Sequence, residues 1–99
     1  MSTSASVSGN NYTYVTTGAT KQVFLGRGVL IGIIINKPLV GTVKVIDNTG
    51  GSTANIATLA SATNGTPTLI GKIEYNVVCN TGLIIINSAT EDLTVIWRQ

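Results

Sequence analysis

The segment from Gly28 to Asn36, GVLIGIIIN, limits the possible folds of this chain more than any other part of it. Its uncharged and mostly β-branched residues are typical of a β-strand. Alternation along a strand gives two apolar faces, made of Val29, Ile31, Ile33 and Ile35 on one side and of Leu30, Gly32 and Ile34 on the other. Such a strand at an open sheet edge would promote aggregation. We therefore expect both faces to be covered by the rest of the chain, by another copy, or by both.

A second segment, Gly82 to Asn87 (GLIIIN), has the same composition. Two matched segments do not make a repeat protein, and we interpret them as two central strands of similar burial. Each large side chain left uncovered would forgo about 1.5–3 kcal/mol, against a total stability of about 5–15 kcal/mol for a small domain. We therefore predict an obligate homo-oligomer whose interface includes Leu30, Ile34, Ile84 and Ile86.

Shorter alternating segments with turn residues between them account for most of the remaining chain. They cover residues 11–17, 21–26, 42–47, 53–60, 69–79 and 93–98. Segment 53–60 would tolerate a helix, but its threonines and short length favour a strand. The region from Ile35 to Val43 is expected to form a hairpin with its flanks. Seven or eight short strands, with turns about every 8–12 residues, predict an all-β fold: an antiparallel β-sandwich with a jelly-roll-like arrangement.

The chain of 99 residues is the length of one domain. Residues 1–20 are predicted to form an N-terminal arm that is partly disordered or bound to a partner, because the first nine are small and polar. Residues 21–99 are then the single sandwich domain. Tyr12 and Tyr14 lie in the arm and are our candidates for contacting another molecule, since tyrosine is enriched at interfaces.

Composition favours self-association over several other kinds of partner. Charged residues make up 10% of the chain, against roughly 25% in ordinary soluble domains, so self-repulsion is weak. The six lysines and arginines are spread singly, without the basic patch that nucleic-acid binding requires. The longest apolar run is too short for a membrane helix. We expect neither a nucleic acid nor a membrane as a partner.

Few residues in the chain suit catalysis or metal binding. There is no histidine and only one cysteine, so Ser-His and Cys-His nucleophile pairs and thiolate metal clusters are not available. Asp47 with Asn48, and Glu91 with Asp92, are two neighbouring pairs that offer oxygen ligands for calcium, although turn chemistry explains Asp47 and Asn48. Cys79 and Trp97 alternate in phase with apolar residues and are interpreted as core. We predict no catalytic residue, no metal site and no cofactor.

Four sequence patterns carry a resemblance to a known group of proteins. They are G-x-GVL-x-GI at 26–33, GTV-x-V-x-DN at 41–48, Y-x-V-x-x-x-x-GL at 75–83 and DLTVIWR at 92–98. Together they resemble the small β-sandwich structural proteins of tailed bacteriophages, which decorate or cement the capsid or occur as small head and tail components. Cys79 departs from the ordinary apolar residue expected at its position.

The resemblance implies a virion structural protein without catalysis. It would assemble as a homotrimer, bind the major capsid protein and stabilise the capsid shell from its outer surface. It would be synthesised in the host cytoplasm, consistent with an N-terminus that lacks a secretory signal pattern. Two alternatives remain open at this point: a phage tail or neck component of the same fold, and a carbohydrate-binding β-sandwich module, which would need an exposed aromatic platform.

Overall fold

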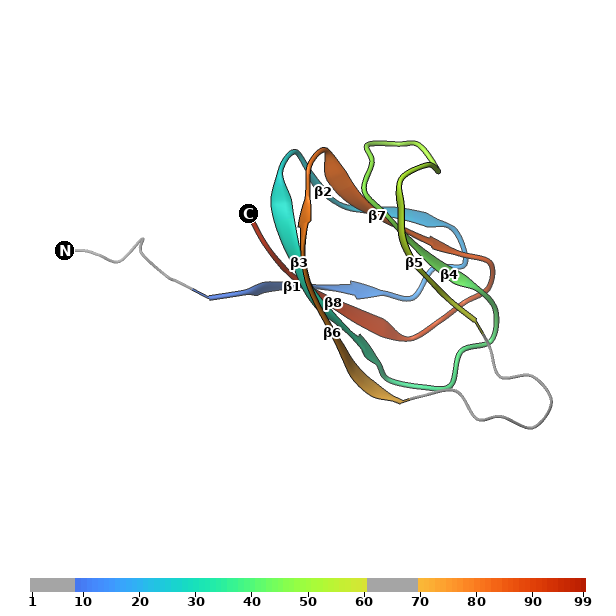
Figure 1. Cartoon of the computed structure of the whole chain (residues 1–99). Helices are drawn as coiled ribbons and strands as arrows, with labels where there is room; N and C mark the ends of the chain where they lie inside the picture. The colour runs from blue at the N-terminus through green and yellow to red at the C-terminus, as the bar shows by residue number, and fades with distance from the viewer. Residues whose placement is uncertain (1–8, 61–69) are drawn as a thin grey trace.

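The computed structural model describes residues 9–60 and 70–99, which form two facing β-sheets (Figure 1). The strands are β1 (Asn11–Val15), β2 (Thr20–Leu25), β3 (Gly28–Ile35), β4 (Val43–Ile46), β5 (Asn55–Leu59), β6 (Gly71–Cys79), β7 (Gly82–Asn87) and β8 (Leu93–Arg98). Sheet A has the order β1-β8-β3-β6, and sheet B has the order β2-β7-β4-β5. All neighbouring strands are antiparallel. The predicted antiparallel β-sandwich is confirmed, and segment 53–60 contains a strand.

The strand pairing is that of a jelly roll. The first strand pairs with the last, β2 with β7, β3 with β6 and β4 with β5, as in one long antiparallel ribbon. Two further pairings, β3 with β8 and β4 with β7, join parts of this ribbon into the two sheets. Strands β3 and β4 therefore lie in different sheets, and the hairpin predicted around residues 35–43 is wrong. Turn residues indicate where the chain reverses, but they do not determine which sheet receives the next strand.

A β-bulge changes which side chains of β3 face the core. The register of β3 against both neighbours, β6 and β8, shifts between Leu30 and Gly32. One extra residue inverts the alternation, so Leu30, Ile33 and Ile35 all enter the core. The predicted faces of this strand, which assumed strict alternation, are therefore wrong. Its central position between two strands is confirmed, as is that of β7.

The core lies between the sheets and is complete within one chain. Trp97 packs against it, with its ring centroid 5.3 Å from that of Phe24. The Trp97 Nε1–H donates a hydrogen bond to Thr13 Oγ1 at 2.9 Å. Cys79 is fully buried, so both residues belong to the core side as predicted. The buried members are Val15, Phe24, Leu30, Ile33, Ile35, Leu39, Val43, Val45, Cys79, Leu83, Ile85, Leu93 and Val95.

Ile84 is fully buried although it lies on the outer side of sheet B. It alternates with the core residues Leu83 and Ile85. The connection between β4 and β5 folds back toward this side of the sheet: its residue Asn48 accepts a hydrogen bond from Gln22 Nε2 at 3.2 Å. Farther along the same connection, Ser52 lines a hollow together with side chains of β4 and β7. The cover on this face therefore comes from the chain itself.

The sandwich begins before the predicted boundary at residue 20. Strand β1 pairs with β8 in register from Asn11, opposite Trp97, to Val15, opposite Leu93. The Val15 side chain is 1% exposed. Residues 11–15 are thus a strand of sheet A rather than part of an arm, and residues 1–8 lie outside the described part of the chain.

Candidate functional site

The outer side of sheet A carries a continuous set of apolar and aromatic side chains. The pairings place Tyr12 beside Ile96, and they place Tyr14, Thr94 and Ile34 in one row across the sheet. These residues alternate along their strands with residues of the core, so they point away from it. We define the sheet A face by its apolar and aromatic members, Tyr12, Tyr14, Val29, Ile34, Val78 and Ile96.

The sheet A face is well exposed to solvent. The exposed fractions are 73% for Tyr12, 56% for Tyr14 and 45% for Val78, and the other members are half-buried. At its margin on β6, Lys72 Nζ lies 3.1 Å from Glu74 Oε1, an exposed ion pair. Aromatic and apolar side chains bordered by charges have the composition of a protein interface, with a hydrophobic centre and a polar rim.

The predicted interface residues separate into three groups in the structure. Tyr12, Tyr14 and Ile34 come together on the sheet A face. Ile86 is half-buried on the outer side of sheet B. Leu30 and Ile84 are 0% exposed within one chain, which corrects their assignment to an interface, because their side chains have no free surface to offer a partner. Sequence reasoning missed Val29, Val78 and Ile96. Alternation with core residues would have indicated Val78 and Ile96, whereas Val29 reaches this face only because of the bulge after Leu30.

A hollow of about 330 Å³ opens where the loops β1–β2, β3–β4 and β7–β8 meet. It adjoins the sheet A face through Tyr14, which borders both. We call it the loop hollow and define it by its lining residues, Tyr14, Thr16, Lys37, Pro38, Val40, Thr90, Glu91 and Asp92.

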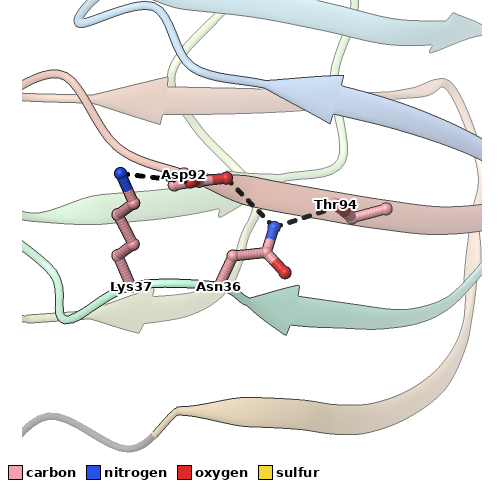
Figure 2. A network of polar contacts seen from close by, with 4 residues as sticks. All are labelled: Asn36, Lys37, Asp92 and Thr94. Carbon is pink, nitrogen blue, oxygen red and sulfur yellow. Dashed lines mark hydrogen bonds and ion pairs between the residues drawn. The ribbon is translucent and has the colours of Figure 1, made fainter.

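A polar network holds one wall of the loop hollow (Figure 2). Asn36 Nδ2, at the end of β3, donates hydrogen bonds to Asp92 Oδ1 at 3.1 Å and to Thr94 Oγ1 at 3.2 Å. Lys37 Nζ lies 3.9 Å from Asp92 Oδ2. A hydrogen bond with Asp92 also raises the pKa of the Tyr14 hydroxyl. The network thus links the ends of β3 and β8 to a side chain of β1.

Glu91 holds the backbone of the β3–β4 connection, which also lines the hollow. Its side chain is 5% exposed, and its carboxylate accepts hydrogen bonds from the backbone N–H of Val40 at 3.0 Å and of Gly41 at 2.8 Å. Both donors lie in the connection between β3 and β4. A buried carboxylate is stable in such a place because backbone N–H groups compensate its lost hydration. Glu91 therefore fixes the β3–β4 loop against the β7–β8 loop.

The other calcium candidate, Asp47, has a structural role. Its Oδ2 accepts a hydrogen bond from Asn80 N at 2.9 Å and its Oδ1 accepts one from Thr81 N at 3.0 Å. Burial raises the pKa of Asp47, but these bonds outweigh that effect, and the pKa lies below its usual value. Within residues 9–60 and 70–99, no three His, Cys, Asp or Glu side chains gather as a metal site would require.

Trp97 and Cys79 were the remaining candidates for chemistry. Trp97 packs on the core and gives its indole N–H to Thr13, so its ring is not an exposed platform. Burial raises the pKa of the Cys79 thiol to about 11. A thiol with such a pKa stays protonated at neutral pH and is a poor nucleophile.

Comparison of the chain with protein family models, curated proteins and solved structures gives no match. In the described residues, no helix is long and apolar enough to cross a membrane.

Proposed function

We propose that this chain is a non-enzymatic structural protein of a tailed bacteriophage particle, of the capsid decoration type, and that the sheet A face contacts other protein subunits. The observation that carries the proposal is the exposed pair Tyr12 and Tyr14 beside Ile34 and Ile96, on a sheet whose other side is a complete core. Tyrosines surrounded by apolar side chains are frequent centres of binding energy in protein interfaces.

The fold and the acidic residues support this proposal. Jelly rolls are a common architecture of viral capsid proteins, although a fold by itself does not assign a function. Asp47 and Glu91 both have their carboxylates hydrogen-bonded to backbone N–H groups. Glu74 is paired with Lys72 on the surface. Each of these acids has a structural partner, as expected in a protein that binds rather than catalyses.

The proposed partners are further copies of this chain, in a homotrimer, and the major capsid protein. Leu30 and Ile84 are covered within one chain, so association in this proposal is not a condition for folding. Contacts in a trimer are heterologous, because a patch on one subunit meets a different patch on the next. The sheet A face would be one of these patches.

Sedimentation velocity tests the self-association part of the proposal. The wild-type protein is expected to sediment as a trimer, and Ile34→Glu, which places a charge in the sheet A face, is expected to be monomeric with an unchanged circular dichroism spectrum. Ile86→Glu is the matched variant, since Ile86 is also half-buried but on the outer side of sheet B. If both variants dissociate, the sheet A face of one subunit contacts the outer side of sheet B on the next subunit in a closed ring, which also supports the proposal. A monomeric wild type, or dissociation by Ile86→Glu alone, contradicts the proposal.

Locating the protein on the phage particle tests the viral part. We expect it on the outer capsid surface, and we expect the wild type, but not Ile34→Glu, to bind empty capsids that have expanded. Density at the tail or neck would instead support the alternative role with the same fold. Failure to co-purify with any phage particle would refute both.

A further inference from the structure

The loop hollow has the position and size of a ligand site. It lies where three loops meet, which in β-sandwich proteins is a frequent place for binding residues. Its volume of about 330 Å³ is near the lower end of the range of about 300–1,000 Å³ for small-molecule sites. The occupant would therefore be a small molecule or the terminal part of a longer one.

The lining of the hollow combines apolar surface with hydrogen-bonding groups. The apolar part consists of the Tyr14 ring, Pro38 and Val40, and Tyr14 and Val40 are 56% and 69% exposed. The polar part consists of the Thr16 and Thr90 hydroxyls, the Lys37 ammonium and the Asp92 carboxylate. A sugar ring has matching chemistry, with an apolar C–H face and a rim of hydroxyls that both donate and accept hydrogen bonds.

We propose that the loop hollow binds a neutral saccharide, with the Tyr14 ring as the stacking platform and Asp92 and Lys37 as hydrogen-bonding partners of its hydroxyls. The geometry supports stacking because Tyr14 is 56% exposed and lines the hollow together with Lys37 and Asp92. The Asp92 carboxylate is oriented by Asn36 at 3.1 Å. Figure 2 shows how Asn36 and Lys37 converge on Asp92 from the end of β3.

The walls of the hollow are fixed before a ligand arrives. Glu91 holds the backbone of Val40 and Gly41 at one side, and Asp92 is bonded to Asn36 at the other. The backbone N–H of Glu91 also donates to Thr16 O at 3.2 Å, which ties the β1–β2 loop to the same site. A site whose loops are already ordered loses less conformational entropy on binding.

Charge selects a neutral ligand over an anionic one. Lys37 lies 3.9 Å from Asp92, so its charge is largely balanced. Glu91 is the third charged residue of the lining, and its carboxylate is occupied by two backbone N–H groups. The formal sum over Lys37, Glu91 and Asp92 is −1, which disfavours phosphate, sulfate and carboxylate ligands.

Titration of ¹⁵N-labelled protein with sugars, followed by NMR, tests the proposal. The probes are neutral methyl glycosides and disaccharides, with sialylated and sulfated sugars in parallel. At least one neutral sugar is expected to shift the amide signals of Tyr14, Thr90 and Asp92. Tyr14→Ala is expected to weaken binding about tenfold, whereas Tyr14→Phe keeps the ring and most of the affinity. Asp92→Asn is expected to weaken binding as well.

Tyr12→Ala is the control, because Tyr12 lies on the same strand and face but does not line the hollow. Its affinity for sugar should equal that of the wild type. The proposal is overturned if no neutral sugar shifts these signals at millimolar concentrations, if Tyr14→Ala binds as well as Tyr12→Ala, or if only the acidic sugars bind. Tyr14 belongs to both the loop hollow and the sheet A face, so subunit contact and sugar binding compete for its ring. Ile34→Glu separates the two proposals, since the monomeric variant should bind sugar at least as tightly as the wild type.

Discussion

Oδ1 of Asp47 lies 3.0 Å from the backbone nitrogen of Thr81, a contact between residues 34 positions apart. Asp47 follows β4 directly, and Thr81 lies in the two-residue turn between β6 and β7. The second carboxylate oxygen accepts the neighbouring N–H of Asn80 at 2.9 Å. Because β6 belongs to sheet A and β7 to sheet B, this one side chain stabilises the point where the chain passes between the sheets.

Replacing Asp47 by Asn should destabilise the fold by about 1–2 kcal/mol at pH 7, because the charge-assisted acceptor of two backbone N–H groups is lost. Urea denaturation followed by Trp97 fluorescence measures the change. Glu74→Gln is the control, since Glu74 is exposed and pairs only with Lys72, and it should be nearly neutral.

The Asp47 contribution should also depend on pH. Its pKa is lowered in the folded state, so the stabilisation is present above the unfolded pKa and is lost as pH falls through the folded pKa. The difference in unfolding free energy between wild type and Asp47→Asn should therefore shrink below about pH 4. A difference that stayed constant down to acidic pH would mean that the charge of Asp47 has no stabilising role.

Glu91→Ala should be more destabilising, by about 2–3 kcal/mol, because it leaves the backbone N–H groups of Val40 and Gly41 without their charged acceptor. Hydrogen exchange should show faster exchange at these two amides, while the strands of sheet A keep their protection. Glu91→Gln retains one acceptor oxygen and should lie between the wild type and the alanine variant. Equal protection of Val40 and Gly41 in all three proteins would argue against the role of Glu91 in fixing the loop.

The sequence was sufficient for the fold class because the strands have local signals. The run from Gly28 to Asn36 marks a central strand, and the alternation of Leu93, Val95 and Trp97 marks a strand with one side in the core. Period-two patterns of this kind depend only on neighbouring residues. These patterns can therefore be recognised without knowing which distant segments pack against the strand.

Other features depend on residues far apart in the sequence, and these escaped prediction. The bulge after Leu30 places Gly32 where an added Cβ would lie 2.7 Å from Ile73 O, a contact with a different strand. The loop hollow joins Tyr14, Lys37 and Asp92 from three separate segments. Ile84 is fully buried within one chain, so its apolar outer side did not indicate a partner subunit.

Truncation of Leu30 and Ile84, which were wrongly predicted to lie in a subunit interface, tests their assignment to the interior of one chain. Leu30→Ala and Ile84→Ala should each cost about 2–5 kcal/mol of unfolding free energy, as expected for fully buried side chains. Ile34→Ala removes a half-buried side chain from the sheet A face and should cost about 1 kcal/mol. Thermal denaturation of the three variants at equal concentration gives the comparison. A larger loss for Ile34→Ala than for Leu30→Ala would restore Leu30 to a surface role.

The Cys79 thiol provides a test of core integrity at alkaline pH. Burial, and then the charge of Asp47, raise its pKa to about 11 in the folded protein, against about 8.5 for a free cysteine. The folded state therefore favours the protonated thiol, and this contribution to stability is complete below about pH 8.5 and is lost as pH rises toward 11. In Cys79→Ala the group is absent, so the wild type should lose stability relative to this variant between pH 8.5 and 11.

Labelling of the native Cys79 thiol at pH 8 should likewise be slow and should accelerate on unfolding in urea. Native labelling as fast as that of a short cysteine peptide would show instead that Cys79 is open to solvent.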